Sequence, residues 1–228
     1  MKILSVNVGS AKPVAFTDAP SGMTGIDKQP VEGPVRVSPP GRPGVGASGV
    51  AGDAVCDLRS HGGDDRAVYA FAREDLDGWE DELGRPLANG AFGENLTTLG
   101  IDLREALVGE RWHIGPEVVL EVTGGRIPCR TFAGWLGEKG WLRRFTRKAA
   151  SGAMLRVIEA GEIGVGDPIE VIHRPAHDVT VSRLFRAVTT ERESLPSVLV
   201  AAPWMEREQL EIARSYTAKY GRRSGGGG

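Results

Sequence analysis

The chain contains 228 residues, of which 40% are hydrophobic and 25% are charged, and its formal net charge is −2. This composition can fill the core of a globular protein, and the slightly acidic balance argues against general binding to nucleic acid or to anionic membranes, which requires a basic surplus. The opening segment has no long apolar run and no stretch approaches the ~20 apolar residues of a membrane span, so we expect a cytoplasmic protein.

Short β-strands are predicted through the first two thirds of the chain, separated by turns rich in glycine and proline. Residues 2–8 alternate apolar and polar side chains, as a half-buried strand does. Residues 118–123 are rich in β-branched side chains, which favours a buried strand. The other strand candidates are 14–17, 35–37, 67–72, 154–158 and 169–172.

Helices are predicted in two places. The segment at 73–84 has Leu76, Trp79 and Leu83 at helical spacing. After residue 178 the pattern is helical in VSRLFRAV, SLPSVLVA and WMEREQLEIARSYTAKY, which predicts three short helices. The predicted organisation is therefore a β-barrel domain, a three-helix unit and a flexible tail, over residues 1–174, 178–221 and 222–228.

Cys129 follows Pro128 in the segment GGRIPCRTF, with Arg126 and Arg130 close by. Neighbouring guanidinium groups lower the pKa of a thiol, and the proline stiffens the loop that presents it. A thiolate on a rigid loop suits a soft or redox-active metal, or it acts as a nucleophile. The alternative for Cys129 is a small buried hydrophobe, which is the favoured interpretation of Cys56, and the sequence leaves both open for Cys129.

Two further segments hold candidate binding residues. In HGGDDRAVY at 61–69, the glycines let a ligand approach the backbone, and His61 and Arg66 can contact a phosphate or a metal-bound oxygen. In AFGENLT at 91–97, a buried Asn95 amide can recognise the edge of a heterocycle. Each segment is equally consistent with an ordinary turn.

Several common signatures are missing from the sequence. No G-x-G-x-x-G lies between a strand and a helix and there is no Walker loop, which argues against ordinary dinucleotide or P-loop chemistry. No C-x-x-C or H-E-x-x-H occurs, which argues against a classical zinc site. The two cysteines do not form a disulfide framework.

Taken together and in order, four segments resemble the MOSC domain family, named after the C-terminal domain of molybdenum cofactor sulfurases. They are HGGDDRAVY, AFGENLT, the Arg126-Ile-Pro-Cys129 segment, and RVIEAGEIGVGD at 156–167. The resemblance is greatest to a stand-alone bacterial branch associated with resistance to N-hydroxylated purine analogues. It runs from about Lys2 to Ile172, and the helical segment from about Asp178 resembles the three-helix appendix of that branch. Gly124 and Gly125 stand where that branch tends to have glutamine and proline.

The resemblance implies a mainly β fold, a MOSC-type β-barrel with a few short helices and a small C-terminal three-helix unit. It also implies binding of a pterin-based molybdenum cofactor (molybdopterin), with Cys129 as the metal ligand, or sulfur transfer through Cys129. Cys129 and His61 are then the candidate catalytic residues. The candidate cofactor-binding residues by position in the matched segments are Arg59, His61, Arg66, Asn95 and Arg126.

Three functions follow from this resemblance. The first is an oxidoreductase that reduces small N-hydroxylated compounds at a molybdenum cofactor and takes electrons from an external protein partner. The second is a metal-independent enzyme, without any cofactor, in which Cys129 carries sulfur or attacks a small metabolite. The third is a non-enzymatic module that binds or delivers a cofactor, with the C-terminal helices as its docking surface. Whether the chain forms an oligomer stays open.

Overall fold

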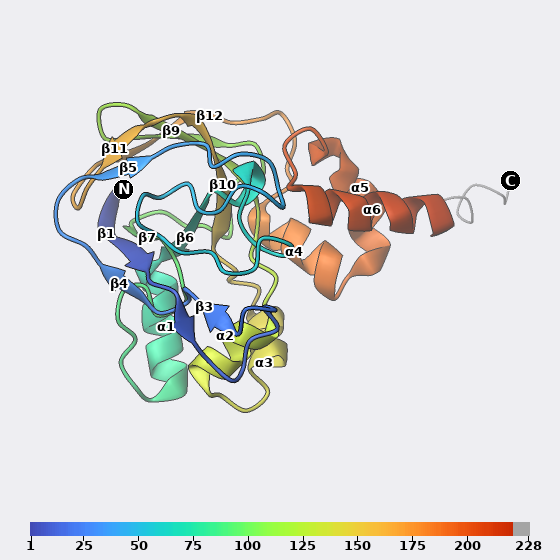
Figure 1. Ribbon diagram of the computed structural model, residues 1–228. Helices are drawn as coiled ribbons and strands as arrows, with labels where there is room; N and C mark the ends of the chain where they lie inside the picture. The colour runs from blue at the N-terminus through green and yellow to red at the C-terminus, as the bar shows by residue number, and fades with distance from the viewer. Residues whose placement is uncertain (221–228) are drawn as a thin grey trace, which may run out of the picture.

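The computed structural model describes residues 1–220 and is built around a curled β-sheet with helices at its margins (Figure 1). The strands are β1 (Lys2–Gly9), β2 (Lys12–Pro13), β3 (Met23–Thr24), β4 (Lys28–Pro30), β5 (Val35–Val37), β6 (Val68–Ala72), β7 (Leu96–Leu99), β8 (Arg111–Ile114), β9 (Val118–Gly124), β10 (Ala153–Glu159), β11 (Gly161–Ile163) and β12 (Ile169–His173). The helices are α1 (Arg73–Leu83), α2 (Arg130–Leu136), α3 (Trp141–Lys148), α4 (Val181–Thr189), α5 (Leu195–Val198) and α6 (Arg207–Tyr220), with short 3-10 turns η1 (Asp64–Arg66), η2 (Arg192–Ser194) and η3 (Leu199–Ala201).

Eight strands form the main sheet in the order β12-β8-β9-β10-β6-β7-β1-β4. The pair β6–β7 is parallel and the other neighbours in this sheet are antiparallel. Backbone hydrogen bonds also join the start of β1 to the start of β12, from Ile3 N to Asp167 O and from Ile169 N to Met1 O. These bonds draw distant parts of the sheet together, so it curls into a half-barrel, as the mainly β prediction requires.

The interior of the half-barrel is filled by side chains that alternate along its strands, with Val6, Leu96, Trp112, Leu120 and Leu155 completely buried. This alternation is the physical reason that period-2 patterning identified strands. The strand predictions over 2–8, 35–37, 67–72, 118–123, 154–158 and 169–172 are confirmed. The predicted helix at 73–84 is α1, which ends in a left-handed glycine as expected.

The strand predicted over 14–17 is wrong, because the chain turns there instead. Val14 donates a backbone hydrogen bond to Gly22, and the neighbouring Phe16 packs against Gly134 of α2. No helix was predicted over 130–148, where α2 and α3 lie. Both helices contribute to an aromatic cluster beneath the site, in which the ring centroids of Trp141 and Phe132 lie 5.3 Å apart.

Helices α4, α5 and α6 form the small C-terminal unit, beside the sheet in Figure 1. Its core contains Leu184, Val188, Leu195, Val198 and Ala213, all buried. Thr180 caps α4 by accepting a hydrogen bond from the backbone of Arg183. The tail predicted over 222–228 lies outside the described residues. Within residues 1–220, no helix is long and apolar enough to cross a membrane.

Candidate active site at Cys129

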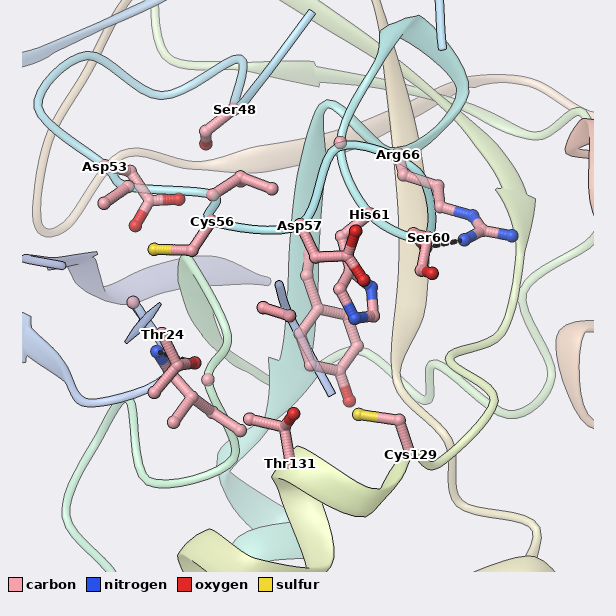
Figure 2. A pocket seen from close by; sticks show the side chains of 18 of the residues that line it. Thr24, Ser48, Asp53, Cys56, Asp57, Ser60, His61, Arg66, Cys129 and Thr131 are labelled. Carbon is pink, nitrogen blue, oxygen red and sulfur yellow. Dashed lines mark hydrogen bonds between the residues drawn. The ribbon is translucent and has the colours of Figure 1, made fainter. Parts of the chain in front are cut away.

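A cavity of about 230 Å³ opens between three chain segments, residues 17–28, 48–66 and 126–131. Figure 2 shows Cys129 and Thr131 at the base of this cavity, with His61 above them and Cys56 on the opposite wall. The cavity lies at the end of β9, where the chain leaves the sheet and enters α2. Five of the six predicted site residues line it: Cys129, His61, Arg66, Asn95 and Arg126.

Cys129 lies at the end of a short segment, residues 125–129, that joins β9 to α2. β9, which precedes it, is paired on both sides, to β8 and to β10. Cys129 is the residue immediately before α2, and its carbonyl oxygen accepts the backbone hydrogen bond of Ala133. Its side chain is half-buried, so the sulfur is both fixed in place and accessible from the cavity.

The environment of Cys129 favours the thiolate. Burial acts to raise the pKa of this thiol, but the interaction with His61 and the positive charge of Arg126 outweigh burial and lower the pKa to about 6. The backbone N–H of Phe132 adds to the same effect. At neutral pH the sulfur is therefore mostly an anion, which is the form that ligates metals and attacks electrophiles.

Arg126 supplies a cation that no carboxylate within the described chain neutralises by an ion pair. Its guanidinium lies 4.4 Å from the ring centroid of Phe132 and 5.1 Å from that of Tyr69, and it donates a hydrogen bond to the carbonyl of Phe92. Stacking on aromatic faces orients a guanidinium without cancelling its charge. The side chain can therefore act on Cys129 and on an anionic ligand at the same time.

The two other predicted arginines are placed differently. Arg66 lines the cavity, but its guanidinium is already bound to Glu206 and Glu208 of the C-terminal unit. Arg59 does not line this cavity. It is exposed, pairs with Asp57, and faces a neighbouring cleft of about 390 Å³ that shares His61 and Arg66 with the first.

Asn95 reaches the cavity wall, but its amide is already used within the fold. Its Oδ1 accepts a hydrogen bond from the backbone of Tyr69 at 3.2 Å, and its Nδ2 donates to Asp53 at 2.9 Å and to the carbonyl of Asn7 at 3.3 Å. These contacts leave few free positions for reading a heterocycle. The residue ties β6 to β1 at the edge of the site.

Sequence reasoning missed a buried ion pair on the cavity wall. Lys28 and Asp53 form it, with side chains that are 8% and 1% exposed. Burial lowers the pKa of Lys28, while the carboxylate of Asp53 opposes that effect. Cys56 was interpreted from the sequence as a small buried hydrophobe, but it lines the same cavity. Its pKa is raised mainly by burial and further by the negative charge of Asp53. Lys28 and Asp53 lie 25 residues apart in the chain, and no local motif indicates that they pair.

The MOSC domain model matches residues 57–170, half of the chain and the part that carries His61 and Cys129. The chain belongs to the MOSC domain family. Among its relatives, the uncharacterized protein YflK of Bacillus subtilis is 31% identical over 179 residues, which cover 78% of this chain and 76% of YflK. A protein named reductase from Gibberella moniliformis is 31% identical over 174 residues, covering 75% of this chain but only 29% of that longer protein.

Solved structures agree with this membership in the MOSC family. The crystal structure of YiiM from Geobacillus stearothermophilus is 25% identical, with a TM-score of 0.75, and the match covers 94% of this chain and 98% of that one. YiiM from Escherichia coli has a TM-score of 0.69 at 21% identity, covering 92% and 94% of the two chains. The second likeness shows the fold alone.

MOSC domains are associated in general with molybdenum cofactor binding, and the chemistry of this site fits such a group. It offers one soft thiolate, at Cys129, and the guanidinium of Arg126, which has no carboxylate partner among residues 1–220. Residues 1–220 contain no group of three or more histidine, cysteine or acidic side chains able to hold a metal ion. A metal at Cys129 would therefore need most of its ligands from the cofactor itself.

Proposed function

We propose that this MOSC protein is a reductase that binds a molybdenum cofactor through Cys129 and acts on small N-hydroxylated compounds. The observation that carries the proposal is the Cys129 thiol, which faces a cavity and has its pKa lowered to about 6 by His61 and Arg126. The reductase from Gibberella moniliformis, at 31% identity, supports reductive chemistry.

In this proposal Cys129, Arg126 and His61 have defined tasks at the cavity. The Cys129 thiolate is the protein ligand of the metal, and Arg126 binds the anionic phosphate of the cofactor. When bound, the cofactor would supply the two electrons that cleavage of an N–O bond requires, and an external electron-transfer protein would replace them. Cleavage of R–NHOH to R–NH₂ and water also consumes two protons. In this proposal His61, beside Cys129, delivers one of them and solvent delivers the other.

Elemental analysis tests the proposal directly. The full chain is produced in a host that makes molybdenum cofactor, and molybdenum is measured per mole of protein for the wild type, Cys129→Ser and Cys56→Ser. Cys56→Ser is the matched control, because it removes the other thiol of the same cavity. We expect molybdenum in the wild type and the control and its loss in Cys129→Ser, together with loss of N-hydroxypurine reduction by a chemical reductant. Wild-type protein without molybdenum would refute the proposal.

One observation favours a second function. A thiol with a pKa of about 6 is ionised at neutral pH without any metal, so Cys129 is also equipped to carry sulfur as a persulfide or to attack a metabolite. Intact-mass measurement separates the two functions. A mass increase of one sulfur at Cys129 in protein from a host that cannot make the cofactor would favour sulfur transfer, and an unmodified thiol would favour the reductase.

A further inference from the structure

The start of α6 contacts the chain segment that leads to Cys129. The backbone N–H of Glu206 donates to the carbonyl of Thr123 at 3.0 Å, and the side-chain amide of Gln209 donates to the carbonyl of Gly125 at 2.8 Å. Both acceptors lie at the end of β9, within six residues of Cys129. Two residues of the C-terminal unit therefore hold the point at which the chain leaves the sheet toward the thiol.

The same turn of α6 contacts the segment that carries His61. The carboxylate of Glu206 accepts hydrogen bonds from Nε and Nη2 of Arg66 at 3.1 and 2.8 Å. Arg66 in turn donates through Nη1 to the carbonyl of Ser60, directly before His61. The glutamate thus acts on the other wall of the cavity through one guanidinium, whose planar fork fixes direction as well as distance.

Glu206 is itself fixed by the helix that it begins. Its two carboxylate oxygens accept the backbone N–H groups of Glu208 and Gln209 at 3.0 and 2.9 Å, as a helix N-cap does. Glu206 and Gln209 are 1% and 2% exposed. Because two buried polar side chains at one helix start both reach the active-site walls, their placement is specified by these contacts rather than by solvent.

The glycine pair before Cys129 makes this contact sterically feasible. A Cβ at Gly124 would lie 2.8 Å from Oε1 of Gln209, and a Cβ at Gly125 would lie 2.2 Å from the hydroxyl oxygen of Ser151. A side chain at either glycine would therefore force Gln209 or Ser151 out of its present position. This chain thus has glycines at 124–125, where the related branch tends to have glutamine and proline, and Gln209 packs closely against Gly124.

We infer that Glu206 and Gln209, the α6 clamp, are positioning residues that hold the Cys129 and His61 segments at their working separation. This gives the C-terminal unit a role in the active site, although the candidate catalytic residues, Cys129 and His61, lie outside that unit. The inference rests on the proposed function for its catalytic meaning, but the geometry it describes concerns only the two cavity walls and is tested without cofactor or substrate.

The test compares the reactivity of two thiols in one molecule. The full chain is treated with iodoacetamide at pH 6, and peptide masses give the alkylation rates of Cys129 and Cys56 separately. The variants are Glu206→Gln, which keeps the size of the side chain but removes its charge, and Gln209→Leu, which removes the donor to Gly125. The control is Glu211→Gln, an exposed position further along α6 that pairs with Arg207.

We expect the Cys129 to Cys56 rate ratio to change by about threefold or more in both clamp variants, because a shift of either cavity wall alters the access of the reagent to Cys129 and the position of His61 beside it. The control should keep the wild-type ratio. Unfolding would bring the two rates together, so the ratio is compared only between proteins whose melting temperature shows that they are folded under the conditions of the assay. If Glu206→Gln does not fold, Gln209→Leu decides alone.

A wild-type ratio in folded Gln209→Leu, or in both clamp variants, would overturn the inference. A ratio that changes equally in Glu211→Gln would also overturn it, because the effect would then belong to the helix rather than to the clamp. Failure of the proposed function is recognised separately, by the absence of molybdenum from the wild-type protein, which does not enter the alkylation ratio.

Discussion

The lowered pKa of Cys129 makes a quantitative prediction about stability. The pKa of this thiol is about 6 in the folded chain, compared with an ordinary value of 9.0. Because the folded value is the lower one, ionisation stabilises the fold fully above pH 9, and this contribution is lost as the pH falls through about 6. For one group, linkage between pH 6 and pH 9 amounts to about 3 kcal/mol of the roughly 4 kcal/mol that the full shift of the pKa represents.

The perturbation is Cys129→Ser, and the assay is urea unfolding of the wild type and the variant at several pH values from 6 to 9. Wild-type stability relative to the variant should rise by up to about 3 kcal/mol across this range. Cys56→Ser is the control and should retain the wild-type rise, because Cys129 is still present. Parallel pH profiles for the wild type and Cys129→Ser would show that Cys129 titrates normally, and the reasoning about its thiolate would be wrong.

Three further changes test other parts of the site. His61→Ala should raise the pKa of Cys129, seen as a shift of the alkylation midpoint to higher pH, and an unchanged midpoint would exclude His61 as its partner. Lys28→Met should cost about 3–5 kcal/mol in unfolding free energy because Asp53 is left buried without its cation, and adding Asp53→Asn should restore part of that loss. Gly125→Ala would place a Cβ 2.2 Å from a serine hydroxyl, so both the melting temperature and Cys129 alkylation should fall, whereas Gly22→Ala, with no atom within 4 Å, should leave Cys129 alkylation unchanged.

The parts of the fold that were predictable from sequence are those determined by local patterns. β1 and β9 bury alternating or β-branched side chains, and α1 has a clear apolar stripe with a glycine stop, so each was identified. α2 and α3 were missed because their apolar residues are few and aromatic and because Gly137 and Gly140 interrupt the segment. The spacing of Trp141 and Phe145, one helical turn apart and both buried, was the available signal.

The candidate site divides in the same way. The setting of Cys129 between Arg126 and Arg130 predicted a lowered pKa, and the pKa of this thiol is lowered in the folded chain, with Arg126 among the causes. His61 lies 68 positions earlier in the chain, and it was predicted as a site residue from the order of the family motifs, not from its spacing to Cys129. The ion pair of Arg66 with Glu206 joins residues 140 apart. Long-range pairs of this kind depend on tertiary packing, and charge patterning along the chain does not reveal them.

The two walls of the cavity differ in how they are anchored, and this has a consequence for change in specificity. Cys129 follows a strand that is hydrogen-bonded along both edges, whereas the facing wall is formed by irregular segments around 17–26 and 48–62. Residue exchanges, insertions or deletions in the irregular wall would reshape the space offered to a substrate while the sulfur stays where it is. We therefore expect sequence changes that alter substrate specificity to accumulate in the irregular wall, while the position of the reactive sulfur is retained.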